Sequence, residues 1–149
     1  SKNNINIIKD WSYCSRFWVL LNDNLRKRYD TKPVHTFDEI QGLKEKFKSQ
    51  IQLYLALLDG EILSGAVFFD TLNVRHLQYA ATSEFGRELS SNDLVNHFAI
   101  EDAKIQKKKY FDFGISTENQ GKYINNGLLK YKESFGSGLT LNKFFVKCL

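Results

Sequence analysis

The sequence of 149 residues is poor in the residue types that mark disorder, disulfide frameworks and membrane spans. It has one proline, nine glycines and two cysteines. So little proline and glycine argues against a disordered or linker-rich chain. Cys14 and Cys148 lie far apart without a C-x-x-C pattern, which favours a reduced, cytoplasmic setting. No apolar run approaches the ~20 residues of a membrane span, and the first residues contain no apolar signal core.

Methionine is absent altogether, including at the first position. We therefore expect the chain to be a piece of a longer protein.

The apolar content of the chain, 42% with 12 phenylalanines, is ample for a hydrophobic core. A domain of this length buries about 68–70% of its unfolded surface, so we expect residues 1–149 to form one domain.

Histidine is scarce, and positive charge is dispersed. His35, His76 and His97 share no ligand spacing, so we expect no metal site.

The net charge is +4, and the basic residues lie in three short runs, at residues 26–28, 44–48 and 107–109. A nucleic-acid surface is usually more concentrated, so a nucleic-acid partner is not expected, whereas a nucleotide cofactor or an anionic glycan is compatible.

Apolar spacing predicts a helix over residues 9–29 and a second helix after Thr36, which opens a T-x-x-E capping box with Glu39. Three strands follow, at residues 51–58, 61–70 and 74–82. Asp59-Gly60 predicts a type I′ turn between the first two. Residues 82–88 are expected to form a loop, and Ser90 begins a helix in S-x-x-D spacing. A strand with Phe111 and Phe113, and a last hairpin-like strand at the C-terminus, complete the order.

This order predicts an α/β fold of layered α+β type, in which a mixed, mostly antiparallel sheet is flanked by helices on both faces. One parallel crossover joins the third strand to the Phe111 strand. On the third strand, Leu77, Tyr79 and Ala81 are expected on one face and His76 and Gln78 on the other. Two polar side chains on one face indicate either solvent or a polar pocket, and we favour the pocket.

Residues 110–136 are least like a generic globular sequence. Asp112 lies in an aromatic strand that we expect to be buried, so its carboxylate needs a partner. It either braces the following loop or belongs to a ligand site, because ligands often lie at the carboxyl ends of strands. The polar run at residues 116–121 is longer than a tight turn requires.

The motifs F-D-F-G-I-S-T-E, N-x-G-L and Y-K-E-S-F-G in this stretch, with K-P-V-H-T and H-L-Q-Y upstream, resemble the Fem-like branch of the GNAT acyltransferases. That branch includes peptidoglycan aminoacyltransferases and N-acyltransferases from polysaccharide gene clusters. Fem-like enzymes are typically two tandem GNAT-type halves, and this chain resembles the C-terminal half. The resemblance therefore implies that a missing N-terminal domain is a partner and lines part of the site.

The resemblance implies an N-acyltransferase. It would transfer an acyl or aminoacyl group to an amine on a cell-envelope sugar or peptidoglycan precursor by direct attack, without a covalent intermediate. The donor is acetyl-coenzyme A or another acyl-coenzyme A, or alternatively aminoacyl-tRNA. The rival hypothesis is a non-catalytic half that supports a partner domain or binds glycan.

Candidate residues follow from these patterns. Fem-like enzymes have a site lysine in the Y-K-E-S-F-G motif, which is Lys132 here; the alternative is a surface lysine paired with an acid. The other catalytic candidates are proton acceptors: Glu118, His76 and Asp112. Candidate substrate-binding residues are polar or aromatic groups of the loops and the third strand: His35, Gln78, Tyr79, Ser116, Asn119 and Asn125. Anion-binding candidates for the cofactor precede or open the helix after the third strand: Gly86, Arg87, Ser90 and Ser91.

Overall fold

The computed structural model describes residues 4–118 and 121–140. It divides into two compact units, Ser1–Gly114 and Ile115–Leu149. Each unit is described by itself below. Two residues named above, Asn119 and Cys148, lie outside the described residues. Most of the hairpin-like strand expected at the C-terminus also lies outside them.

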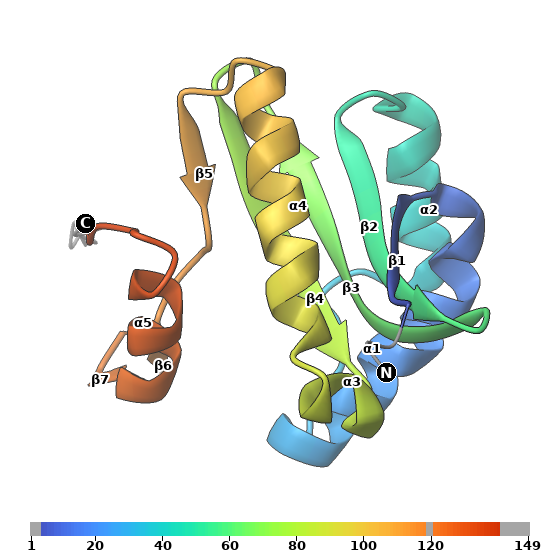
Figure 1. Cartoon of the computed structure of the whole chain (residues 1–149), viewed down its shortest axis with the longest axis horizontal. Helices are drawn as coiled ribbons and strands as arrows, with labels where there is room; N and C mark the ends of the chain where they lie inside the picture. The colour runs from blue at the N-terminus through green and yellow to red at the C-terminus, as the bar shows by residue number, and fades with distance from the viewer. Residues whose placement is uncertain (1–3, 119–120, 141–149) are drawn as a thin grey trace, which may run out of the picture. The chain divides into compact units, whose positions relative to one another are not determined.

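The first unit is built on a five-stranded sheet with the order β1-β2-β3-β4-β5 (Figure 1). Its strands are β1 (Asn6–Lys9), β2 (Ile51–Leu58), β3 (Glu61–Asp70), β4 (Val74–Thr82) and β5 (Tyr110–Asp112). Neighbouring strands from β1 to β4 pair antiparallel, and β5 pairs parallel to β4. The mixed, mostly antiparallel sheet expected from the sequence is confirmed, as is the parallel crossover.

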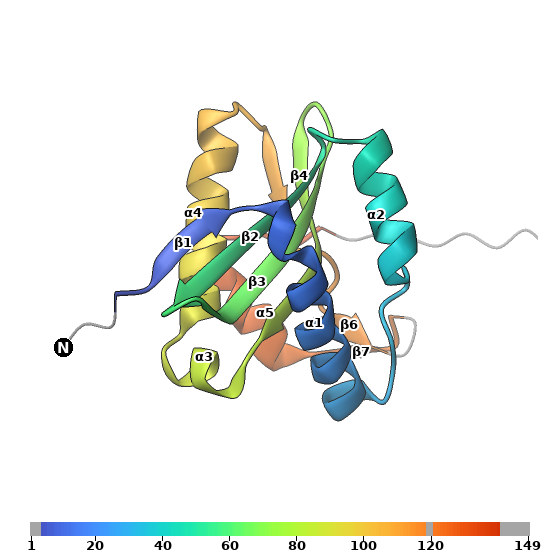
Figure 2. The ribbon, with the colours of Figure 1, turned by 90° about the vertical axis from the view of Figure 1, so that its right-hand side faces the viewer.

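Helices cover both faces of this sheet. The helices η1 (Trp11–Tyr13), α1 (Cys14–Tyr29) and α2 (Phe37–Lys46) precede β2, and α3 (Glu84–Glu88) and α4 (Ser91–Ile105) lie between β4 and β5 in the chain. Figure 2 shows α1 and α2 on one face of the sheet and α4 on the other. The capping box at Thr36 is present, with both reciprocal bonds to Glu39. It satisfies two backbone donors at the start of α2, as predicted.

Two apolar clusters form the core, one on each face of the sheet. The α1 and α2 face packs side chains such as Phe17, Trp18 and Ile40 against β2 and β3. The α4 face packs Val95 and Ala99 against other residues of the same strands. Because β2 and β3 contribute side chains to both clusters, their sequences are apolar almost without interruption rather than alternating.

The turn between β2 and β3 is confirmed at Asp59-Gly60, where both residues have positive φ angles, 51° and 79°. Other local predictions were wrong in part. The helix expected over residues 9–29 ends at Tyr29 but begins later, with α1 at Cys14, and Lys9 belongs to β1. Residues 84–88 form the short helix α3 instead of a loop, because the Ser83 hydroxyl accepts the Gly86 N–H and caps it. Ser90 directly precedes α4 as predicted, but it adopts a left-handed conformation and its side chain makes no capping hydrogen bond.

A β-bulge in β4 corrects the face assignment. Val67 pairs with Tyr79, whereas Phe68 pairs with Leu77, so Gln78 is an extra residue without a position opposite it. An inserted residue reverses the alternation of side chains. Leu77 therefore packs in the α4-side cluster, while Tyr79 packs in the α1-side cluster, and the two do not share a face as predicted.

A buried ion pair anchors α4 to the sheet. Arg75 of β4 is fully buried and binds both carboxylate oxygens of Asp70, at 2.9 and 2.7 Å. Its other terminal nitrogen donates to the Ala99 carbonyl and to Asp102 of α4, which also accepts the Tyr54 hydroxyl. Burial alone would lower the pKa of Arg75, but hydrogen bonds to the two carboxylates raise it above its ordinary value.

The second unit contains a short antiparallel pair, β6 (Thr117–Glu118) and β7 (Tyr123–Ile124), and the helix α5 (Asn126–Glu133). Asn125 caps α5 by accepting the Leu128 N–H. The short helix predicted after the polar run is therefore present.

Candidate active site at the opening between β4 and β5

The parallel pair β4–β5 opens after three residue pairs. Val74, Arg75 and His76 lie opposite Tyr110, Phe111 and Asp112. Strand β5 ends there and the chain turns at Gly114, which has a φ of +72°, while β4 continues to Thr82. Among the described residues of the first unit, no strand pairs with β4 beyond His76 on this side.

His76 and Asp112 meet where the opening begins. His76 Nδ1 lies 2.7 Å from one Asp112 carboxylate oxygen, and the other oxygen accepts the Gly114 N–H at 2.8 Å. The side chains are 37% and 51% exposed. The prediction that Asp112 needs a partner is confirmed, and it also braces the following turn. The expectation that it is buried was wrong, because its strand is the sheet edge.

The open part of β4 presents main-chain groups. The Ser83 N–H donates to the Leu63 carbonyl, which directs it toward β3. Since alternate residues of an antiparallel strand turn their polar groups to opposite sides, Ala81 also faces β3 and Ala80 faces the opening. Ala80 is exposed. Among the described residues of the first unit, no strand covers this edge of β4 beyond His76, although the Thr82 N–H on the same side donates to the Asn24 side chain at 3.1 Å.

His35 and Tyr79, two of the predicted substrate-binding residues, lie together on the α1 and α2 face. The His35 N–H donates to the Tyr79 hydroxyl at 3.2 Å, and His35 Nδ1 lies 2.6 Å from the same oxygen. Because this oxygen accepts the backbone N–H, its own hydrogen is available for Nδ1. The His35 ring also lies near Phe69, which pairs with His76 across β3 and β4. His35, Tyr79 and His76 therefore border one region of this face.

The predicted cofactor residues follow β4, and two of them, Gly86 and Arg87, have structural roles. A Cβ at Gly86 would lie 2.1 Å from the Leu63 carbonyl oxygen, so the glycine permits close packing on β3. The Arg87 guanidinium donates to the Asn24 side chain at 3.1 Å. Ser91 is fully buried at the start of α4, and within the described part of the chain its hydroxyl oxygen has no hydrogen-bond partner.

The remaining candidates lie in the second unit. Asn125 donates to the Glu118 carboxylate at 2.8 Å, and the Asn125 N–H donates to the Ser116 carbonyl at 2.9 Å. Lys132 is 7% exposed, and its ammonium group donates to the Ile115 carbonyl at 2.6 Å. Lys132 is thus a buried lysine that ties α5 to the start of this unit, rather than a surface lysine.

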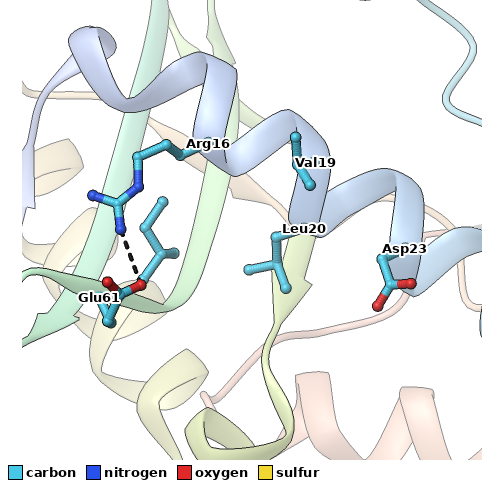
Figure 3. Close-up of a pocket in the computed structure, with 6 residues that line it drawn as sticks. Arg16, Val19, Leu20, Asp23 and Glu61 are labelled. Atoms are coloured by element: carbon cyan, nitrogen blue, oxygen red, sulfur yellow. Dashed lines mark hydrogen bonds and ion pairs between the residues drawn. The ribbon is translucent and has the colours of Figure 1, made fainter.

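Two shallow depressions lie elsewhere on the first unit. One, of about 280 Å³, is lined by α1 and β3 and includes the Arg16–Glu61 ion pair at 3.0 Å (Figure 3). The other, of about 400 Å³, is lined by residues of α2 and by His35. Neither includes His76 or Asp112.

Sequence reasoning missed the bulge at Gln78 and the exposed main chain at Ala80. Neither has a side-chain signal, because both depend on the register between strands.

Across residues 4–118 and 121–140, no group of three His, Cys, Asp or Glu side chains is arranged to hold a metal ion. The helices in the same ranges include none that is long and apolar enough to cross a membrane.

A mixed, mostly antiparallel sheet flanked by helices matches the fold of a GNAT acetyltransferase domain. The family model described as acetyltransferase (GNAT) domain matches residues 14–133, and the chain belongs to this family. It is therefore an acetyltransferase of the GNAT type, a class that uses acetyl-coenzyme A.

Solved structures share this fold at low sequence identity. An aminoglycoside acetyltransferase from an uncultured soil metagenomic sample, in complex with trehalose, has a TM-score of 0.70 and 10% identity, with 99% of both chains covered. An aminoglycoside N-acetyltransferase in complex with coenzyme A has a TM-score of 0.70 and 12% identity, covering 99% of this chain and 97% of that one. A Trypanosoma brucei acetyltransferase has a TM-score of 0.69 and 12% identity, covering 97% and 100%. No curated protein matches the chain in sequence.

Proposed function

We propose that the chain is an N-acetyltransferase of the Fem-like branch, which transfers an acetyl group from acetyl-coenzyme A to an amine on a cell-envelope sugar or peptide. The observation that supports this proposal best is the opening between β4 and β5. It exposes a main-chain edge at Ala80 beside two polar side chains, His76 and Asp112. The motifs of residues 110–136 support the Fem-like assignment.

The residues present fit acetyl-coenzyme A. Its pantetheine arm contains two amide groups, and an extended amide chain pairs with a free strand edge as a further strand does. The edge of β4 at Ala80 would hold it. The start of α4 follows β4 after the short helix α3, and backbone N–H groups and the helix dipole there favour a pyrophosphate. Ser90 and Ser91 belong to this start, and the buried Ser91 hydroxyl has no hydrogen-bond partner among the described residues.

Two acids limit how the pyrophosphate is held. Glu84 and Glu88 lie on α3, close along the chain to the start of α4, and would repel it. Arg87 offsets part of this charge, although its guanidinium is bound to Asn24. We therefore assign Gly86 and Arg87 to shaping this connection, and Ser90 and Ser91 to the cofactor.

An acceptor with an amine fits the groups around the opening. His35 and Tyr79 present an imidazole and a phenol, which suit sugar hydroxyls, and we also assign Gln78 to the acceptor. Structural neighbours include one aminoglycoside acetyltransferase in complex with trehalose and in complex with sisomicin. These complexes support an amine-bearing saccharide as the acceptor class. Within the second unit, candidates for substrate contacts are Ser116, Glu118, Asn119, Asn125 and Lys132.

The reaction needs no covalent enzyme intermediate. The amine attacks the thioester carbonyl, and the developing oxyanion requires a donor, for which a main-chain N–H of the bulged β4 is suited. Acetyl-coenzyme A supplies the activated acetyl group. The chain's own residues hold the donor, orient the amine and accept its proton.

A calorimetric titration of the full chain with acetyl-coenzyme A tests the donor. Release of coenzyme A thiol in the presence of glucosamine, galactosamine, sisomicin or a lysine-containing peptide tests the acceptor class. We expect binding and amine-dependent release. The absence of heat at millimolar donor would remove the coenzyme A proposal and favour aminoacyl-tRNA.

A non-catalytic half is the second candidate. The hydrogen bonds that tie Lys132 to Ile115 and Asn125 to Glu118 give those residues structural roles, which favours this reading for the second unit. Replacement of Glu118 by alanine and of Lys132 by methionine distinguishes the two. Unchanged turnover in both variants would remove them from the catalytic machinery.

A further inference from the structure

We infer that His76 is the group that takes the proton from the attacking amine, and that Asp112 is a positioning residue that fixes its tautomer. The inference deepens the proposed function and rests on it. It stands on the meeting of a β4 imidazole and a β5 carboxylate at the last residue pair before the strands part.

The hydrogen bonds around Asp112 determine which imidazole nitrogen accepts a proton. An ionised carboxylate only accepts hydrogen bonds, so Nδ1, at 2.7 Å from it, must carry the hydrogen. Nε2 is then the nitrogen with the lone pair. The carboxylate itself is held from its other side by the Gly114 N–H at 2.8 Å. A base whose second nitrogen is held by a fixed acid is the arrangement that orients an imidazole in general-base catalysis.

The position of His76 gives a substrate access to it. Its side chain is 37% exposed, and its pair on β3 is the apolar residue Phe69. A side chain at position 114 would contact the ring, since a Cβ there lies 3.7 Å from Cε1. Glycine at position 114 therefore leaves this side of the ring without a side-chain contact from that position.

The other candidate groups are less suited to accept a proton. The Lys132 side chain is buried, and its ammonium group already donates to the Ile115 carbonyl at 2.6 Å. Glu118 already accepts a hydrogen bond from Asn125.

The step balances with no further reactant. The acceptor arrives as an ammonium ion and gives one proton to Nε2 of neutral His76. The amine nitrogen attacks the carbonyl carbon, the C–N bond forms, and the C–S bond breaks with its electron pair on sulfur. The nitrogen loses its second proton to the leaving thiolate, which gives an N-acetyl amide and coenzyme A. The imidazolium then releases its proton to water.

Replacement of His76 by glutamine tests the base. With the acceptor found in the amine panel above, we expect kcat to fall by about 10²–10⁴-fold, because a general base contributes about that much. The Kd of acetyl-coenzyme A from calorimetry should stay within about twofold, because the donor contacts remain. The matched control is His97→Gln, since His97 is an exposed histidine of α4. It should retain wild-type kinetics.

Two further measurements keep the test decisive if a variant is unstable. Added imidazole should restore part of the activity of His76→Ala, which a purely structural histidine would not allow. Asp112→Asn should lower kcat and leave the Kd of acetyl-coenzyme A within about twofold, because an amide can donate to Nδ1 and so favour the wrong tautomer of His76. Among the described residues of the first unit, Asp112 of β5 is a charged group bonded to His76, and the pair of His76 on β3, Phe69, is uncharged.

The outcomes separate the two claims. A wild-type chain that transfers to an amine, together with a His76→Gln variant that keeps wild-type kcat, overturns the inference and leaves the proposed function standing. A wild-type chain that binds no acetyl-coenzyme A and acetylates no amine overturns both.

Discussion

Removal of the buried guanidinium of Arg75 should destabilise the first unit more than removal of any exposed charge. Arg75→Met leaves Asp70, whose side chain is 3% exposed, without its bidentate partner. Breaking a buried ion pair from one side costs about 3–5 kcal/mol, because the remaining charge stays buried. Lys108 offsets part of this cost, because its Nζ lies 3.8 Å from an Asp70 carboxylate oxygen. The expected loss in the free energy of unfolding is therefore about 3 kcal/mol.

Urea unfolding followed by tryptophan fluorescence reports the stability of the first unit, because Trp11 and Trp18 both belong to it. With a slope of about 1.5 kcal/mol/M, the unfolding midpoint should fall by about 2 M. Arg16→Met is the matched control. The Arg16 side chain is 49% exposed and its pair with Glu61 lies on the surface (Figure 3), so it should cost about 1 kcal/mol or less. Equal midpoints for the two variants would refute the reasoning.

Three further outcomes are expected. Gly86→Ala should lower the free energy of unfolding in urea by about 1–3 kcal/mol or more, because the added Cβ would clash with the Leu63 carbonyl. Its control, Gly42→Ala, adds a Cβ in open space within α2 and should raise the free energy of unfolding by about 0.5–1 kcal/mol. Burial raises the pKa of Cys14 to about 12, so with the other cysteine replaced by serine, a disulfide reagent at pH 8 should label the folded chain far more slowly than the urea-unfolded one. Burial acts to raise the pKa of Asp102, but hydrogen bonds from a tyrosine and an arginine outweigh it and lower that pKa. Its contribution to stability is therefore complete above about pH 4 and lost as the pH falls through the lowered value, and Asp102→Asn should flatten this acid dependence of the unfolding free energy.

Strong local signals made most of the fold predictable. The Asp59-Gly60 turn, the capping box at Thr36 and the apolar strands are short-range features, and each is present. Strand β1 was missed because four residues, N-I-I-K, are too few to show a period. Its pairing with β2 depends on a partner far along the chain. The short helix α3 was missed because the hydroxyl of Ser83 was not recognised as its cap.

The candidate site was predictable only in part. The sequence placed His76 and Asp112 on adjacent parallel strands, and the structure brings their side chains within hydrogen-bond distance. It did not predict the bulge at Gln78, because an extra residue is defined by the register with β3 rather than by composition. Nor did it predict that Arg75 is fully buried, since an isolated sequence does not show which carboxylates will surround an arginine.

The order of the strands also sets an order of assembly. Strands β2, β3 and β4 are consecutive in the chain and joined by short connections, so they lose little entropy when they meet. The outer strands β1 and β5 reach their partners only after a long segment has been enclosed, and contacts of that kind form late and slowly. The opening between β4 and β5 is then among the last features to form during folding, because it exists only once β5 has docked beside an already formed β4.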